Sequence, residues 1–178
     1  MSTLTVKELA APTGYDLTLA SGETLDLSGG SVTMPAGHIL QVVRSTVRTT
    51  QDDTTSSTPS EIHSDYRVAI TPSSTSSKIL LMLQGNWRMQ PDSSFGLGIY
   101  RSIDGGSYSK VTTGNGGEAW RNRDTTWILQ LSGMVTHYDE PSTTNECIYT
   151  PYYWANSGDA RMNDNGLGSF LLAMEIAG

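Results

Sequence analysis

The chain has 178 residues and 18 glycines, with a net charge of −7 and charged side chains at only 16%. That length suffices for one core and an appendage. The acidic balance leaves no basic patch to neutralise phosphates, so we expect neither nucleic acid nor an anionic membrane as a partner. Low charge, with Gly, Ser and Thr between short apolar runs, is typical of an all-β protein.

Two further features bear on the compartment. The single cysteine, Cys147, permits no intrachain disulfide, and we expect it to be a buried small hydrophobe in a protein that folds in a reducing cytosol. The first residues, "MSTLTVKELAAPTG", lack the basic start and apolar run of a signal peptide. No apolar run in the sequence is long enough for a membrane span.

Residues 1–37 differ in pattern from the rest of the chain. They contain three apolar pairs with a spacing of two, which places both members of a pair on one face of a short strand. Such short strands cannot bury an apolar face alone, so we predict an ordered arm that trimerises or anchors the protein. The anchoring residues are Leu17, Leu19, Leu25, Leu27, Val32 and Met34. The alternative is a disordered tail.

Residues 38–178 alternate between short β-type runs and turns rich in Gly, Ser, Pro or Asn, and no helix of normal length is predicted. The run 79–83 is continuously apolar, which is typical of a strand covered on both faces. Residues 71–77, "TPSSTSS", predict a tight connection in which hydroxyl groups satisfy the backbone of the turn. The predicted strands lie at 38–50, 62–70, 78–89, 97–103, 125–139, 147–156 and 167–178, with a further return strand just after residues 104–106.

About eight such strands predict an antiparallel β-sandwich, jelly-roll-like, with a closed barrel as the alternative. The expected domains are therefore an arm at 1–37 and a sandwich at 38–178. Residues 112–124 are expected to form a glycine-rich loop, and residues 104–106 (Asp-Gly-Gly) a hairpin turn.

The sequence offers little catalytic chemistry. His38, His63 and His137 are far apart and match no ligand pattern, and no serine lies in a nucleophile elbow. The segment "DARMNDNG" fails the spacing of a calcium loop because no Asp stands at its first position. We therefore predict that the protein is not an enzyme and carries no cofactor or metal.

The aromatic residues are the best candidates for recognition. Trp120 lies beside Arg121 and Arg123 in the predicted loop, which suggests an exposed surface that binds a ligand such as a glycan. Contact between subunits explains an exposed tryptophan equally well. Trp127, in the apolar run that follows, is expected in the core.

Four segments share their order with a known family. They are "GSVTMPAGHILQVV", "RVAITPSSTSSKILLMLQGNW", "GLGIYRSIDGGSY" and the closing "SFLLAMEIAG". In this order they resemble a domain of structural proteins in tailed bacteriophages, notably phages of cyanobacteria and other marine bacteria. The resemblance covers roughly residues 30 to 178. It departs from the family at "RSIDGG", where a plainer turn is usual.

The resemblance implies a trimeric β-structured virion protein, assembled in the host cytoplasm. The short arm favours a capsid decoration (cement) protein or a short head fibre, with the major capsid protein or other virion proteins as partners. The alternative is a tail fibre that recognises a host surface glycan. A glycan hydrolase is less favoured because no pair of carboxylates stands out.

Overall fold

The computed structural model describes residues 21–22, 34–112 and 118–178, without the side chains of 118–120 and 165. The chain divides into two compact units, Met1–Thr33 and Met34–Gly178. Nearly all described residues belong to the second unit. The predicted boundary at residue 37 stays a prediction, as does the arm that it delimits.

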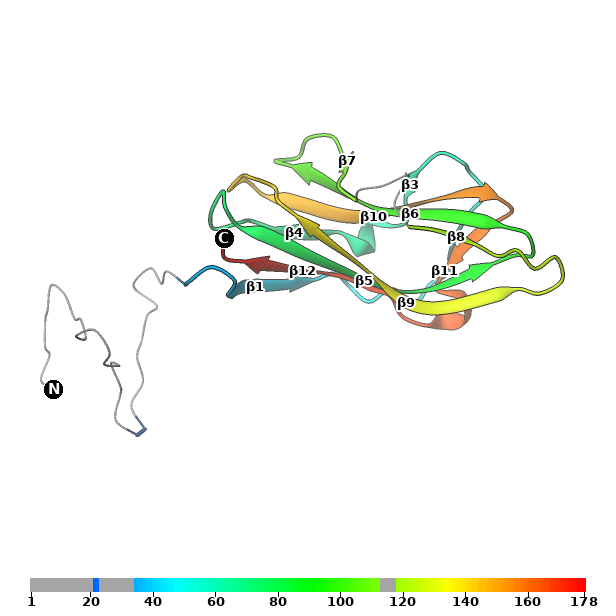
Figure 1. Cartoon of the computed structure of the whole chain (residues 1–178), viewed down its shortest axis with the longest axis horizontal. Coiled ribbons are helices and arrows are strands. Elements are labelled where there is room, and N and C mark those ends of the chain that lie inside the picture. The colour runs from blue at the N-terminus through cyan, green and yellow to red at the C-terminus, as the bar shows by residue number, and fades with distance from the viewer. Residues whose placement is uncertain (1–20, 23–33, 113–117) are drawn as a thin grey trace, which may run out of the picture. The chain divides into compact units, whose positions relative to one another are not determined.

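The second unit is an antiparallel β-sandwich, as the sequence predicts (Figure 1). Two six-stranded sheets pack face to face, and successive long strands alternate between them in a jelly-roll-like order. The β5 sheet consists of β1 (Ile39–Arg44), β12 (Phe170–Ile176), β5 (Lys78–Met89), β11 (Ala160–Met162), β2 (Asp52–Thr54) and β9 (Leu129–Asp139). The β6 sheet consists of β3 (Ser60–Glu61), β4 (Val68–Ile70), β10 (Cys147–Ser157), β6 (Ser94–Ile103), β7 (Ser109–Lys110) and β8 (Glu118–Arg121).

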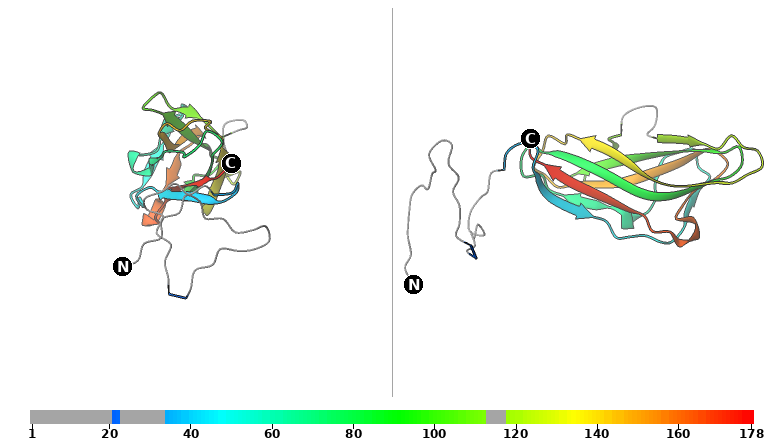
Figure 2. Two further views of the ribbon diagram at one scale, coloured as in Figure 1. Left: turned by 90° about the vertical axis from the view of Figure 1, so that its left-hand side faces the viewer. Right: turned by 60° about the horizontal axis from the view of Figure 1, so that its bottom comes forward.

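Two strands organise the sheets because each is long enough to pair along both of its edges. In the β5 sheet, β5 pairs with β9 along its whole length and with β12 and β11 on the other side. In the β6 sheet, β10 pairs with β6 on one side and with β3 and β4 on the other. Both views of Figure 2 show the two layers and the tilt between their strands.

The core lies between the sheets and follows from the period of two in each strand. Alternate residues of β5 (Ile79, Leu81 and Leu83) are fully buried against Leu97 and Ile99 of β6. Cys147 is also buried, as predicted, and burial raises the pKa of its thiol.

The structure differs from the predicted elements at several places. Residues Ser64–Tyr66 form a 3₁₀ turn (η1) inside the strand expected at 62–70, so that only β4 remains extended. A bulge after Ile39 interrupts the alternation expected for β1. Residues 118–121 form the strand β8 rather than a loop, and β11 forms inside a segment expected to be loop, just before a second 3₁₀ turn, η2 (Asp164–Gly166). These short elements depend on pairing with distant strands, which local sequence does not encode.

The hairpin predicted at 104–106 is present between β6 and β7. Asp104 and Gly105 both have positive φ, at 52° and 71°, as a tight turn between antiparallel strands requires.

Candidate interaction surfaces

The outer face of the β5 sheet is apolar over four neighbouring strands. Cross-strand neighbours align in rows, such as Val42–Met174–Leu80–Tyr138 and Leu172–Met82. Val42 is 54% exposed and Met134 is 52% exposed, and the other members are exposed or half-buried. We call this surface the apolar face; its residues are Ile39, Val42, Leu80, Met82, Met134, Tyr138, Phe170, Leu172, Met174 and Ile176.

Charged groups lie only around the apolar face. Lys78 Nζ lies 3.1 Å from Glu140 Oε1 and 5.6 Å from the centre of the Tyr138 ring. The guanidinium of Arg44 lies 5.5 Å from the centre of the Phe170 ring. None of the outward positions of β1, β5, β9 and β12 carries Asp or Glu. The face therefore lacks the acidic groups that dominate the chain as a whole.

This face corrects one expectation. The run 79–83 was expected to be covered on both sides, but within one chain only its inward residues are buried. Leu80 and Met82 point outward and are half-exposed. The pattern is that of a doubly covered strand, and the second cover does not come from the described part of the chain.

The outer face of the β6 sheet is covered by its own aromatic rings, in contrast to the apolar face. Trp154 of β10 is only 8% exposed and lies against Gly96 of β6. Next to it, the rings of Tyr100 and Tyr152 stack with their centres 4.0 Å apart. Tyr108 lies 6.1 Å from Tyr152, and Arg67 lies 5.7 Å above the ring of Tyr108. The three tyrosines are half-buried against one another, so their rings cover this part of the sheet within one chain.

Most residues of the predicted arm cannot be placed. Leu17, Leu19, Leu25, Leu27 and Val32 lie outside the described residues. Met34 is described and is 43% exposed. Their predicted role in anchoring or trimerisation therefore stays a prediction.

One end of the sandwich carries an exposed tryptophan. Trp127 was expected in the core, but it is 72% exposed, because β9 begins only at Leu129 and residue 127 lies in the loop beyond the end of the sheet. Ile128, beside it, is also exposed. The sequence alone does not reveal this exposure, because Trp127 stands in an apolar run and is therefore predicted to be part of the strand.

The predicted ligand surface is partly at the same end. Arg121 closes β8 and Arg123 follows in the loop that leads to Trp127, and both arginines are exposed. The backbone of Trp120 lies in β8, but its side chain is outside the described residues. The predicted role of Trp120 therefore stays a prediction, and the structure adds Trp127, whose exposed side chain follows the two arginines in the same loop.

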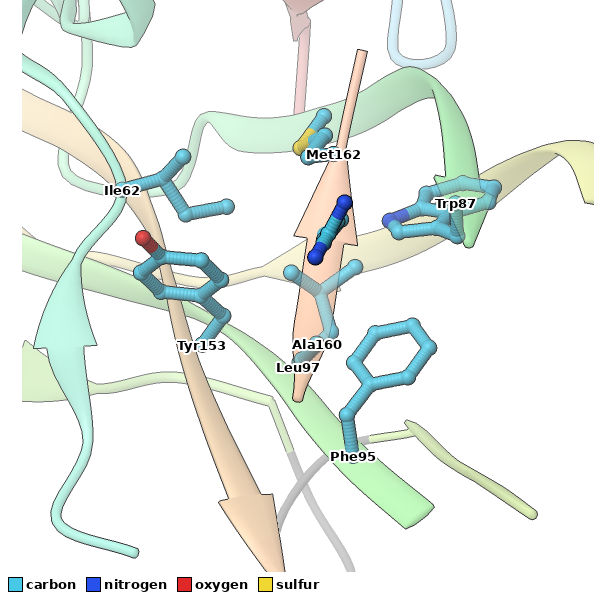
Figure 3. Close-up of a pocket in the computed structure, with 8 residues that line it drawn as sticks. Ile62, Trp87, Phe95, Leu97, Tyr153, Ala160 and Met162 are labelled. Atoms are coloured by element: carbon cyan, nitrogen blue, oxygen red, sulfur yellow. The ribbon is translucent and has the colours of Figure 1, made fainter. Parts of the chain in front are cut away.

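The gap in the core is not a ligand site. It is lined mostly by apolar side chains from both sheets, among them Trp87, Phe95 and Met162, as Figure 3 shows, and also by Arg161. The space among them is too narrow to admit a water molecule. It is a small packing gap of the kind found in many cores.

Two buried carboxylates join segments that are distant in sequence. Asp139 accepts hydrogen bonds from Arg101 at 2.6 Å and from Tyr149 at 2.7 Å, which links the β5 sheet to the β6 sheet. Glu175 is held by four donors described below. Every partner is a side chain or backbone group of the fold, so both carboxylates are structural.

No group of three or more His, Cys, Asp or Glu side chains in the described part of the chain is arranged to hold a metal ion. Among the same residues, no helix is long and apolar enough to cross a membrane.

No protein family and no curated protein matches the sequence. Solved structures with a similar fold include the Eiger TNF of S. frugiperda, at 9% identity and a TM-score of 0.47, where the match covers 76% of this chain and 92% of the other. They also include infectious bursal disease virus, at 11% identity and a TM-score of 0.38 for the Gx strain and 14% and 0.34 for the Gt strain. Those matches cover 94% and 95% of this chain but 46% and 47% of the viral chains, so the chain spans about half their length. At such identities the likeness concerns the fold alone.

Proposed function

We propose that the chain is a non-enzymatic structural protein of a phage virion, which forms a homotrimer through the apolar face. The observation that carries the proposal is that ten large apolar side chains share one sheet face that the described chain leaves uncovered. Exposed apolar patches of this kind mark interaction sites, because monomeric proteins rarely tolerate them.

The size of the apolar face fits a protein interface. Four strands at a spacing of about 4.8 Å and three alternating rows give a surface of roughly 20 Å by 20 Å, or on the order of 400 Å². That is the apolar centre of a standard interface, which buries about 800 Å² on each partner.

The charge distribution favours further copies of the same chain as the occupant. The chain carries a net charge of −7, so that two copies repel each other over most of their surfaces. The apolar face has no acidic group among its outward positions, and at its edge Lys78 is paired with Glu140 and Arg88 with Asp164. Contact through this face therefore avoids the like-charge repulsion and buries apolar surface at the same time.

The virion assignment rests on the ordered resemblance of four segments to phage structural proteins. Within that assignment, we favour capsid decoration or a short head fibre. Residues 1–37 then form the part that docks on the major capsid protein or another virion protein, and the sandwich forms an outward knob.

The first test is the mass of the purified full chain in solution. Size-exclusion chromatography with light scattering is expected to give three times the chain mass of 19.2 kDa at micromolar concentration. A stable single chain under these conditions contradicts the proposal.

The second test is the location on the particle. Phage particles that carry the protein are incubated with a gold-labelled copy of the chain. Electron microscopy is then expected to show label over the capsid. Label confined to the tail contradicts capsid decoration and supports the tail fibre alternative.

A further inference from the structure

The end of the sandwich that bears Trp127 lies opposite the end where the chain enters. Figure 1 shows β1 beginning near the C-terminus at one end, and the loop between β8 and β9 at the other; the turned view in Figure 2 agrees. Three connections meet there, residues 90–93, 122–128 and 157–159, the last of which includes the final residue of β10, and we call them the loop tip. Their positions make the loop tip the part of the sandwich farthest from residues 34–39.

Hydrogen bonds tie the three connections together. The Asp92 amide donates to the Asp124 carbonyl at 2.8 Å, and the Asn122 amide donates to the Ser93 carbonyl at 2.9 Å. Ser157 Oγ donates to the Asp92 carbonyl at 3.3 Å. Gly158, with φ of 69°, packs so closely on Ser93 that an added Cβ would lie 2.7 Å from the Ser93 Cβ.

The loop that carries Trp127 has a fixed backbone. Asn122 is buried, and its Nδ2 donates to the Trp127 carbonyl at 2.7 Å and to the Gln90 carbonyl at 3.1 Å. Asp124 Oδ1 accepts from the backbone amides of Thr126 at 2.7 Å and Trp127 at 2.8 Å. These bonds hold the backbone on both sides of the indole without using the indole itself. The loop therefore presents an aromatic plane to solvent at little entropic cost on binding.

The charged side chains at the loop tip differ in how closely other groups of the fold contact them. The Asp124 carboxylate accepts hydrogen bonds from two backbone amides, which lower its pKa. Asp159 is paired with Arg161 at 2.7 Å. Arg121 reaches Asp92 only at 3.5 Å, with both side chains exposed. Arg121 and Arg123 thus leave guanidinium groups in solvent within one loop of an exposed indole.

We propose that the loop tip binds an acidic carbohydrate. The flat C–H face of a pyranose stacks on the Trp127 indole, and the sugar carboxylate receives hydrogen bonds from Arg121 or Arg123. An indole covers a large apolar area at low cost in side-chain entropy, and the guanidinium fork matches a carboxylate in geometry. The positive groups favour an acidic over a neutral sugar. This inference does not depend on the trimer or on the site of the protein in the virion.

The test uses the full chain on an array of uronate- and sialate-containing oligosaccharides, each printed beside its methyl ester. The ester keeps the ring and removes the charge. We expect binding to one or more acidic sugars and at least about tenfold weaker binding to the matching esters, since one lost charged hydrogen bond is worth a factor of that order. Absence of binding across the array, or equal binding to acid and ester, overturns the proposal.

Three variants separate the contacts. Trp127→Ala and the double variant Arg121→Gln/Arg123→Gln are each expected to weaken the binding at least about tenfold. Leu167→Ala, which removes another exposed apolar side chain outside the loop tip, is the matched control and is expected to bind as the parent does. Unchanged binding of Trp127→Ala overturns the proposal.

Solution mass distinguishes this proposal from the trimer. If Trp127→Ala dissociates the oligomer and still binds the sugar, then the indole is a contact between subunits and the sugar site is wrong. If the parent protein is a single chain that binds acidic sugar through Trp127, then the trimer is wrong and the sugar site stands.

Discussion

Ser77 Oγ donates a hydrogen bond of 2.6 Å to Glu175 Oε1, and both residues are buried. The same oxygen accepts from the amide and the hydroxyl of Ser73, at 2.6 and 2.7 Å, and Glu175 Oε2 accepts from Gln41 at 2.5 Å. One carboxylate therefore fastens the connection 71–77 to the last strand and to β1. It also joins "TPSSTSS" and "AMEIAG", two of the segments on which the resemblance to phage proteins depends.

Replacement of this carboxylate is expected to destabilise the sandwich. Glu175→Gln keeps one oxygen but turns an amide group toward the Gln41 amide, so donor faces donor. We expect the free energy of unfolding to fall by roughly 1–3 kcal/mol in urea titrations at fixed protein concentration. The control is Glu146→Gln at an exposed carboxylate, which is expected to change little. An equal loss in both variants contradicts a special role for Glu175.

The same site predicts a pH dependence. Burial opposes ionisation of Glu175, but the hydrogen bonds from Ser77, Gln41 and Ser73 outweigh it, so its pKa lies below the ordinary value for Glu. The stability that this carboxylate contributes is present above about pH 4.3 and is lost as the pH falls through the lower pKa of the folded state. The gap in unfolding free energy between the parent and Glu175→Gln should therefore narrow below about pH 4. A gap that stays constant from neutral to acid pH would contradict this.

The sequence predicts the long strands and the sandwich because their apolar residues repeat with a period of two over many positions. It also predicts the tight connection at 71–77, whose hydroxyl groups are indeed used. It does not reveal that Glu175 is the acceptor, because 98 residues separate the carboxylate from Ser77. Contacts at such separation depend on the register between strands rather than on local pattern.

The two candidate surfaces were less predictable for a related reason. The continuous run 79–83 signals cover on both faces, but only the structure shows which face is left to a partner. Trp127 was expected in the core because its neighbours are apolar, whereas Asn122 and Asp124 fix it in a loop. An Asn and an Asp shortly before an apolar run can indicate a tight loop of this kind. The signal can be used only when the position where the strand begins is known.

A charge at the centre of the apolar face is expected to abolish self-association. Met174 points outward between Val42 and Leu80, so Met174→Lys leaves the inner core intact and brings lysines into the proposed interface. We expect a single-chain mass by light scattering and an unchanged far-ultraviolet circular dichroism spectrum, since burial of an unpaired charge costs more than the contact provides.

The matched control is Thr144→Lys, which places the same charge in the exposed loop between β9 and β10. It is expected to keep the mass of the parent. If Met174→Lys also keeps that mass while remaining folded, then the apolar face is not the interface and another surface holds the chains together.

The last prediction concerns the closed outer face of the β6 sheet. A Cβ on Gly96 would lie 2.1 Å from Cε2 and Cζ2 of the Trp154 ring, far inside contact distance. Because Trp154 is buried there, Gly96→Ala must displace the indole, and we expect a loss of roughly 1–3 kcal/mol in unfolding free energy with a red-shifted tryptophan emission.

A double-mutant cycle separates this clash from a general effect of alanine in the strand. Trp154→Ala removes the ring, at a cost typical of a large core truncation, and leaves room for the added methyl group. In that background Gly96→Ala is expected to cost less than about 0.5 kcal/mol, because the three atoms nearest to the new Cβ all belong to the indole that is removed. An equal cost in both backgrounds means that the close approach of Trp154 is not what requires glycine at position 96.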